Sequence, residues 1–208
     1  MVIAPEMKDV LKAARFLVGR IRKTPVEKSY SLSDMAGSEV FLKWENQQLC
    51  GSFKIRGALN KMYSLTSLER GRGVITASSG NHAQGVAMAA SLLGVRAVIC
   101  VPGSCPETKR EAILSRGSGL VDLRVIGRFY DEAEAEAKAV AERDGLVYVS
   151  AYEDHHIVSG QGTLGLEFLM EVPDLDLLIV PISGGGLISG VATAARALRP
   201  GIEVIGVH

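Results

Sequence analysis

Lys54 lies in a short segment whose residue types suit covalent chemistry on a carbonyl compound. Residues 51–60 read Gly-Ser-Phe-Lys-Ile-Arg-Gly-Ala-Leu-Asn. A lysine amine held against an apolar neighbour such as Phe53 loses hydration, which lowers its pKa and makes it a nucleophile able to form a Schiff base. In the competing interpretation, Ser52 caps a helix and Lys54 is a solvated residue of its first turn. The segment by itself fits both interpretations.

A second group of polar residues follows an apolar strand candidate and opens a helix candidate. Residues 77–85 read Ala-Ser-Ser-Gly-Asn-His-Ala-Gln-Gly. The hydroxyls of Ser78 and Ser79, the amide of Asn81 and the N–H groups of a helix N-terminus suit a carboxylate or a phenolate-like oxygen. A Ser or Asn cap with a tight turn explains the same serines and glycine. His82 alone is more typical of a hydrogen-bonded structural histidine than of a base.

The third loop is rich in glycine and also lies between a strand candidate and a helix candidate. Residues 181–190 read Pro-Ile-Ser-Gly-Gly-Gly-Leu-Ile-Ser-Gly. Successive glycines let the backbone approach a ligand and direct several N–H groups at a phosphate. The loop matches neither Gly-x-Gly-x-x-Gly nor a phosphate loop that ends in Gly-Lys-Ser/Thr. An imine-forming lysine, polar groups beside it and a backbone phosphate cradle together describe a pyridoxal 5′-phosphate site.

Apolar runs alternate with helical patterns along most of the chain. The predicted strands are 39–44, 73–77, 97–101, 120–126, 146–149, 176–181 and 203–207. The predicted helices are 7–18, 53–65, 81–93, 106–116, 130–143, 157–171 and 187–198, with Pro106 as a first helical residue and Gly145 as a C-cap. This alternation predicts an open α/β architecture with mostly parallel strands. Ligands of such sheets bind beyond the carboxyl ends of the strands, where all three loops fall.

The composition excludes several classes of protein. With 47% hydrophobic and 22% charged residues, the chain is globular, and its 23 basic and 23 acidic side chains create no field that would attract nucleic acid or an anionic membrane. No apolar run is long enough to span a bilayer, and the first six residues lack the features of a signal peptide. Three cysteines fit neither a disulfide framework nor a zinc site, so we expect a cytoplasmic protein.

Segments 52–58 and 78–85 together resemble the threonine dehydratase/serine racemase branch of the fold type II pyridoxal-phosphate enzymes, and 183–190 resembles that family's phosphate loop. The order, the spacing and an intervening Gly-Gln-Gly-Thr at 160–163 agree over nearly the whole chain. The resemblance implies a tryptophan synthase β-like fold, with two open, mostly parallel sheets and helices on both faces. Residues 1–70 and 149–208 would form the larger, cofactor-binding domain, here incomplete, and 71–148 the smaller α/β domain.

The resemblance also implies a role for each matching residue. Lys54 would hold pyridoxal 5′-phosphate as a Schiff base and then act as the base at Cα. In racemising relatives, Ser79 is placed to exchange a proton on the opposite face of Cα. The cofactor-binding residues would be Phe53, Lys54, Asn81, Ser183, Gly184, Gly185, Gly186 and Leu187. The substrate-binding residues would be Ser78, Ser79, Gly80 and His82.

The activity implied by the resemblance is dehydration and deamination of L-threonine or L-serine to a 2-oxo acid and ammonia. The alternatives are serine racemase activity, or a truncated, non-catalytic protein that binds the cofactor or another ligand. One methyl group in a pocket changes discrimination only modestly, so the sequence leaves threonine and serine both open. The expected partners are a small amino-acid substrate and further copies of the chain, with no nucleic acid and no membrane.

The chain departs from the family pattern in two places. Ser183 replaces the first of four glycines, and we expect cofactor binding to survive provided that this position does not require a positive φ. Relatives continue beyond His208 into segments that supply part of a divalent-cation site, so no metal ligand is assigned. The last predicted strand, 203–207, is expected to leave apolar surface uncovered, and the chain is expected to need partner surface.

Overall fold

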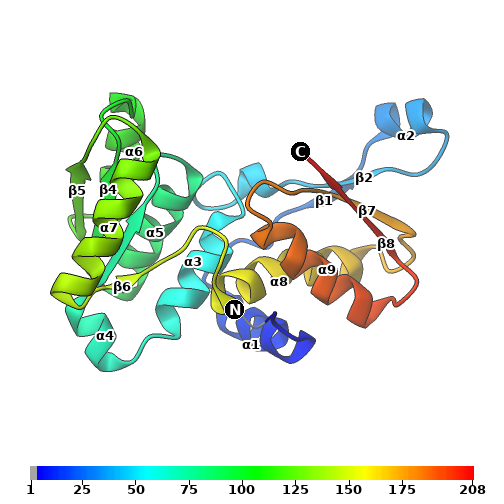
Figure 1. Ribbon diagram of the computed structural model, residues 1–208. Coiled ribbons are helices and arrows are strands. Elements are labelled where there is room, and N and C mark those ends of the chain that lie inside the picture. Colours follow the sequence, from blue (N-terminus) through cyan, green and yellow to red (C-terminus); the bar gives the residue numbers. More distant parts are fainter. Residues whose placement is uncertain (1–3) are drawn as a thin grey trace.

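The computed structural model describes residues 4–208 as two groups of secondary structure joined along one central helix, α3 (Figure 1). The elements, in chain order, are α1 (Met7–Leu17), β1 (Val26–Lys28), α2 (Tyr30–Ala36), β2 (Phe41–Lys43), the 3₁₀ helix η1 (Glu45–Gln47), α3 (Lys54–Tyr63), α4 (Ser67–Arg72), β3 (Val74–Ala77), α5 (Asn81–Leu93), β4 (Ala97–Val101), α6 (Glu107–Gly117), β5 (Val121–Val125), α7 (Tyr130–Asp144), β6 (Val147–Tyr148), α8 (His155–Glu171), β7 (Leu177–Pro181), α9 (Gly186–Leu198) and β8 (Glu203–Val207).

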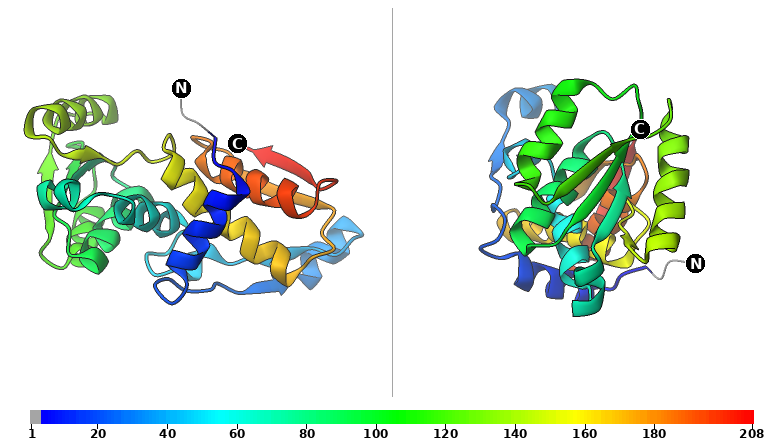
Figure 2. Two further views of the ribbon diagram at one scale, coloured as in Figure 1. Left: turned by 90° about the horizontal axis from the view of Figure 1, so that it is seen from below. Right: turned by 90° about the vertical axis from the view of Figure 1, so that its left-hand side faces the viewer.

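One group is built on a four-stranded parallel sheet with the order β5-β4-β3-β6. Helices α5 and α6 cover one face of the sheet and α7 covers the other, as the right-hand view of Figure 2 shows. All four residues of β3 are buried. A strand covered on both faces has no solvent side, which explains why its sequence is apolar without alternation. The carboxyl ends of β3 and β6 lead into α5 and α8.

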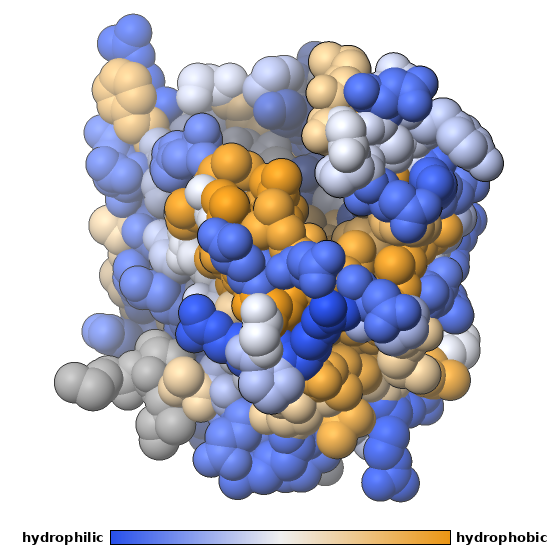
Figure 3. Space-filling model, turned by 90° about the vertical axis from the view of Figure 1, so that its right-hand side faces the viewer, coloured by the Kyte–Doolittle hydropathy of each residue, from blue (hydrophilic) through white to orange (hydrophobic). Residues whose placement is uncertain are grey.

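The other group contains two small sheets and the helices α1, α8 and α9. Strands β1 and β2 pair antiparallel, and β7 and β8 pair parallel. Leu178 and Val180 pack on α9, whereas the alternate side chains Ile179, Ile205 and Val207 are 65%, 40% and 48% exposed. Figure 3 shows apolar residues gathered on this side of the molecule between hydrophilic side chains. The uncovered apolar surface expected at the last strand is therefore present, and it extends to β7.

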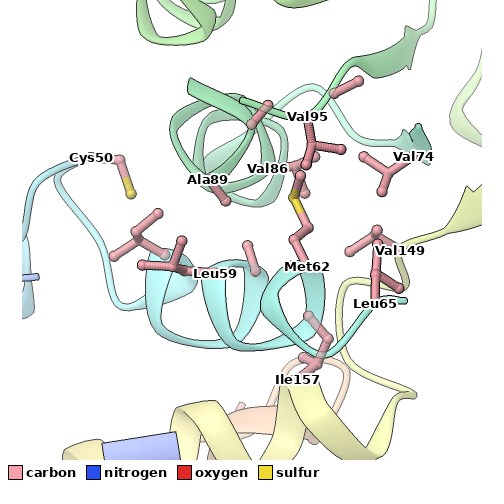
Figure 4. Packing of buried hydrophobic residues seen from close by; sticks show 14 of the residues in the cluster. Cys50, Leu59, Met62, Leu65, Val74, Val86, Ala89, Val95, Val149 and Ile157 are labelled. Carbon is pink, nitrogen blue, oxygen red and sulfur yellow. The ribbon is translucent and has the colours of Figure 1, made fainter. Parts of the chain in front are cut away.

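Helix α3 lies between α5 and α8 and carries the largest apolar core of the described residues. Leu59 and Met62 are fully buried. Figure 4 shows Val86 and Ala89 of α5 on one side of α3 and Ile157 of α8 on the other. Apolar burial on two opposite faces fixes the rotation of α3 about its axis, because any rotation would expose one of them to solvent. The residues at the start of α3 are therefore held in a defined direction.

The predicted pattern of strands and helices is confirmed for most of the chain. The bounds of α5, β4 and β8 agree with the prediction, and Gly145 ends α7 in the left-handed conformation with a φ of 67°. Pro106 is a correction: it is the cap of α6, and the helix begins at Glu107. The predicted α/β class with mostly parallel strands is confirmed, and α9 packs on one face of the β7–β8 sheet. The division into two domains stays a prediction.

The sequence patterns missed β1, α2 and α4. Strand β1 has three residues, too few to show alternation, and α2 buries none of its residues and so has no apolar face. Helix α4 did carry a signal, because Thr66 and Glu69 form a capping box across its first turn. No helix among the described residues is long and apolar enough to span a membrane.

The crossing of α3 and α8 yields a test of the packing. A Cβ added to Gly160 would lie 2.6 Å from the carbonyl oxygen of Arg56 and 2.7 Å from Cα of Gly57. Because these are backbone atoms that cannot turn away, we expect Gly160→Ala to lower the free energy of unfolding by about 1–3 kcal/mol despite the better helix propensity of alanine. Urea denaturation monitored by circular dichroism would measure the change.

The matched control is Gly71→Ala, because Gly71 also lies in a helix and a Cβ there meets no atom within 4 Å. This substitution should stabilise the protein by about 0.5–1 kcal/mol. Equal effects at the two positions would contradict the close crossing.

Candidate active site

Lys54 is the first residue of α3, and its side chain is half-buried. Its Nζ donates a hydrogen bond to the carbonyl oxygen of Ala151 at 2.9 Å and lies 5.3 Å from the centre of the Phe53 ring. Burial lowers the pKa of the Lys54 amine below its ordinary value. Ser52 is buried, and the cap position is held by Phe53. The geometry favours the reactive amine over the solvated residue of a serine-capped helix.

The serine-rich loop lies next to this amine. Strand β3 ends at Ala77 and α5 begins at Asn81, with Gly80 as its cap residue. A Cβ added to Gly85 would lie 3.1 Å from the carbonyl carbon of Lys54, so the first turns of α5 and α3 are in contact. Residues 78–80 are half-buried, and Asn81 is exposed. The serine-rich loop and the N-terminus of α5 therefore lie near the first turn of α3.

The His82 side chain is buried inside the protein. It is 3% exposed, and its Nε2 lies 3.1 Å from the carbonyl oxygen of Val149. Burial and the nearby charge of Lys54 lower the pKa of His82 to about 4, so the ring is neutral at neutral pH. A carbonyl only accepts, so Nε2 carries the proton, and Nδ1 is left without a partner among the described residues. A role for His82 toward a substrate carboxylate is thereby restricted to its backbone N–H.

At Gly184 and Gly186, the glycine loop lies too close to Tyr152 to accommodate a side chain. A Cβ on Gly184 would lie 2.4 Å from Cδ1 of Tyr152, and one on Gly186 would lie 3.0 Å from the Tyr152 Cα. Gly185, the cap residue of α9, has a φ of 85°. Ser183 has a φ of 46°, so this position does require the left-handed region. The sequence predicts that cofactor binding survives the replacement of glycine by Ser183 provided that the position does not require a positive φ. This condition is not met, and the backbone of Ser183 is strained.

A fourth segment, residues 149–152, joins the three loops. The carbonyl oxygen of Val149 contacts His82, that of Ala151 accepts from Lys54, and Tyr152 packs against the glycine loop. The sequence patterns did not single out this segment. A signal was available, because it follows a predicted strand and so lies at the carboxyl edge of the sheet, like the other loops.

The residues present fit a phosphorylated carbonyl cofactor. The backbone of 183–186 leads into the N-terminus of the 13-residue helix α9, where N–H groups are available to a phosphate. The cradle exists only because Gly184 and Gly186 lack side chains. An amine of lowered pKa stands beside the same 149–152 segment. The described residues contain no group of three or more His, Cys, Asp or Glu side chains that could hold a metal ion.

The positive φ of Ser183 can be tested by removing its side chain. Glycine adopts this conformation without strain, so we expect Ser183→Gly to raise the free energy of unfolding by about 1 kcal/mol. Ser189→Gly, inside helix α9, should lower it by about 0.5 kcal/mol because glycine is a poor helix former. Urea denaturation of both variants would check the opposite signs, and a destabilised Ser183→Gly would argue against the strain.

The buried neutral His82 makes stability depend on pH. Its pKa is about 4 in the folded protein and 6.5 as the reference value, so the unfolded chain binds the proton more readily between these values. Stability should therefore be lost as the pH falls from 6.5 towards 4, by about 3 kcal/mol. His82→Gln should remove this part of the slope in denaturation measured across that range. Equal slopes for wild type and His82→Gln would refute the assignment.

Comparison with known proteins gives relatives that match nearly the whole of this chain. The chain is 43% identical over 202 residues to the L-threonine ammonia-lyase of Thermotoga maritima, covering 97% of this chain and 50% of that protein. It is 41% identical over 200 residues to the catabolic L-threonine dehydratase TdcB of Escherichia coli K12, covering 96% of this chain and 60% of that protein. The chain thus spans about half to three fifths of the length of these relatives.

Solved structures of similar fold include a serine racemase and a threonine deaminase. Maize serine racemase superposes with a TM-score of 0.94 at 39% identity, covering 99% of this chain and 62% of that one. The processed threonine deaminase isoform 2 from Solanum lycopersicum superposes with a TM-score of 0.90 at 40% identity, covering 96% and 57%. Residues 17–208 match one family throughout, and by that match this chain belongs to the pyridoxal-phosphate dependent enzymes.

Proposed function

We propose that this chain provides the cofactor and substrate site of a pyridoxal 5′-phosphate-dependent ammonia-lyase that converts L-threonine or L-serine to a 2-oxo acid and ammonia. The observation that carries the proposal is the Lys54 amine, half-buried and hydrogen-bonded at 2.9 Å to Ala151 in the segment that also contacts the serine-rich and glycine loops. The relatives named as L-threonine ammonia-lyase and L-threonine dehydratase support this choice of substrate class.

Lys54 is the residue that would bond to the cofactor and move the α-proton. Its lowered pKa keeps a larger fraction of the amine neutral near neutral pH than an exposed lysine would have, and only the neutral amine is a nucleophile or a base. Phe53 lies beside it and excludes water from one side. When bound, pyridoxal 5′-phosphate supplies the electron sink that stabilises the carbanion left at Cα.

The loop between β3 and α5 would receive the substrate carboxylate. Ser78 and Ser79 offer hydroxyls, and Gly80 and the backbone N–H of His82 lie at the N-terminus of the 13-residue helix α5, where negative charge is favoured. Because the His82 ring is neutral and buried, this binding depends on neutral donors and the helix dipole. The exposed amide of Asn81 would donate to the phenolic oxygen of the cofactor.

The phosphate would be bound by the backbone at the start of α9. Gly186 and Leu187 are buried, and Ser183 and Gly184 are exposed, so the loop presents one open edge. The five residues Ser183, Gly184, Gly185, Gly186 and Leu187 carry no basic side chain. Their N–H groups and the helix dipole would therefore balance the phosphate charge.

Serine racemase activity is the second candidate, because the structure of maize serine racemase superposes with a TM-score of 0.94. In that reaction, Ser79 would return a proton to the face of Cα opposite Lys54. The visible residues serve both reactions, since each begins with loss of the α-proton.

Three further expectations belong to the same proposal. The exposed apolar face of β7 and β8 supports association with further copies of the chain. The three cysteines of the chain are buried and free, which favours a cytoplasmic protein. We retain the two-domain division, with 1–70 and 149–208 forming the larger domain and 71–148 the smaller.

Borohydride reduction of the purified chain with pyridoxal 5′-phosphate tests the anchoring lysine. We expect the cofactor to be recovered on the peptide that contains Lys54, because burial lowers the pKa of this amine. Lys54→Ala should abolish both the adduct and the release of 2-oxo acid from L-threonine and L-serine. Lys109→Ala, at an exposed residue of α6, should change neither.

The outcomes separate the alternatives. Absence of a Lys54 adduct in the wild-type chain would contradict the cofactor site. If the Lys54 adduct forms and L-serine is converted to D-serine without release of 2-oxo acid, the racemase is favoured. An adduct with neither product would favour a binding protein that lacks turnover.

A further inference from the structure

Helix α8 contacts both helices that carry the proposed cofactor residues. It packs on α3, which begins with Lys54, and on α9, which follows the glycine loop. Residues 160–163 of α8, the Gly-Gln-Gly-Thr segment, contact both of these helices and have no role in the chemistry proposed above.

The four residues of the segment divide their contacts between the two helices. Gly160 lets the backbones of α8 and α3 approach, since a Cβ there would lie 2.6 Å from the Arg56 oxygen. The Gln161 Oε1 accepts from the backbone N–H of Gly57 at 3.2 Å. Gly162 faces α9, where a Cβ would lie 2.8 Å from the carbonyl oxygen of Gly190. The segment thus fixes both spacings at once.

Arg56 makes several polar contacts across the α3–α8 interface. Its side chain is fully buried and donates two hydrogen bonds to Glu45, at 2.8 Å each, and two to Glu167, at 2.7 and 2.9 Å. Its Nη1 also donates to Thr163 Oγ1 at 3.2 Å. Lys43 adds a second cation to Glu167 at 2.7 Å. Two cations and two carboxylates balance in this cluster, which joins α3 to α8, η1 and β2.

Arg56 and Lys54 are two residues apart on one helix. Successive residues of an α-helix are rotated by about 100°, so these two side chains leave α3 about 200° apart, on opposite faces. A guanidinium that forms bidentate hydrogen bonds with two carboxylates leaves its helix little freedom to rotate or to shift along its axis. Because both side chains belong to one rigid helix, fixing the face of α3 that carries Arg56 also fixes the direction of the opposite face, which carries Lys54.

The geometry points to Arg56 as a positioning residue: through Glu167 and Thr163 of α8, it holds the first turn of α3 so that the Lys54 amine keeps a fixed place relative to the glycine loop at the start of α9. The benefit of this positioning for catalysis rests on the proposed function. The placement of the Lys54 amine by Arg56 does not, and it can be measured on the chain without cofactor. The substitution Arg56→Lys would keep the positive charge but could not form bidentate hydrogen bonds with two carboxylates.

The test is Arg56→Lys in the intact chain, with Lys54 itself as the reporter. Competitive acetylation over a range of pH, followed by peptide mass analysis, gives the titration midpoint of the Lys54 amine without any cofactor. Because burial lowers the Lys54 pKa, a loosened first turn should hydrate the amine and raise that midpoint by roughly half a unit or more. The dissociation constant for pyridoxal 5′-phosphate should rise by about tenfold, since correct placement of the amine is lost.

The matched control is Asn60→Ala. Asn60 also joins α3 to α8, donating to the His156 carbonyl at 2.8 Å and to Ser159 Oγ at 3.2 Å, but it lies six residues beyond Lys54. It should lower the melting temperature without moving the Lys54 midpoint. Should Arg56→Lys fail to fold, Thr163→Val removes a single contact to Arg56 and should shift the midpoint in the same direction by less.

An unchanged Lys54 midpoint in the Arg56 and Thr163 variants, or an equal shift in Asn60→Ala, would overturn the positioning role. Failure of the proposed function shows differently, as an absence of cofactor adduct in the wild-type chain. In that case, the midpoints measured without cofactor would still decide the role of Arg56.

Discussion

The ion cluster around Arg56 is the interaction on which the rest of the site depends. Burial opposes a charged guanidinium and charged carboxylates alike, yet the hydrogen bonds among them keep the pKa of Arg56 raised and that of Glu167 lowered. Both partners therefore stay ionised inside the protein. Removal of one partner from such a pair typically costs about 3–5 kcal/mol, because the other charge stays buried and uncompensated. The ion pairs of Arg56 with Glu45 and Glu167 therefore hold η1, α3 and α8 together next to Lys54.

The segment 149–152 then brings together loops that are far apart in the sequence. Each of its contacts is a short-range one: a carbonyl to a buried imidazole, a carbonyl to an amine and a ring to glycine backbone. Because β6 is parallel to β3, its carboxyl end reaches the edge where the serine-rich loop begins. The same segment continues into α8, so the site and the helix that aligns it are consecutive along the chain.

Much of the fold could be predicted from the sequence, because buried parallel strands need continuous apolar runs and their helices need capped, periodic segments. The run at β4 and the cap at Gly145 are examples. Short or unburied elements such as β1 and α2 could not be predicted, since they leave no periodic pattern. In the site, the burial of His82 and the φ of Ser183 depend on packing against other segments, which no local pattern records.

The sequence by itself determined the chemistry available to this protein: an amine, hydroxyls and an amide at helix starts, and a glycine loop without basic side chains. Residue type fixes these properties wherever the residues lie. Only the tertiary structure decided which of them act together, that the His82 ring is buried and neutral, and that Gly160-Gln161-Gly162-Thr163 aligns two helices. The physical reason is that desolvation, close backbone approach and charge pairing arise between segments that meet only in the folded chain.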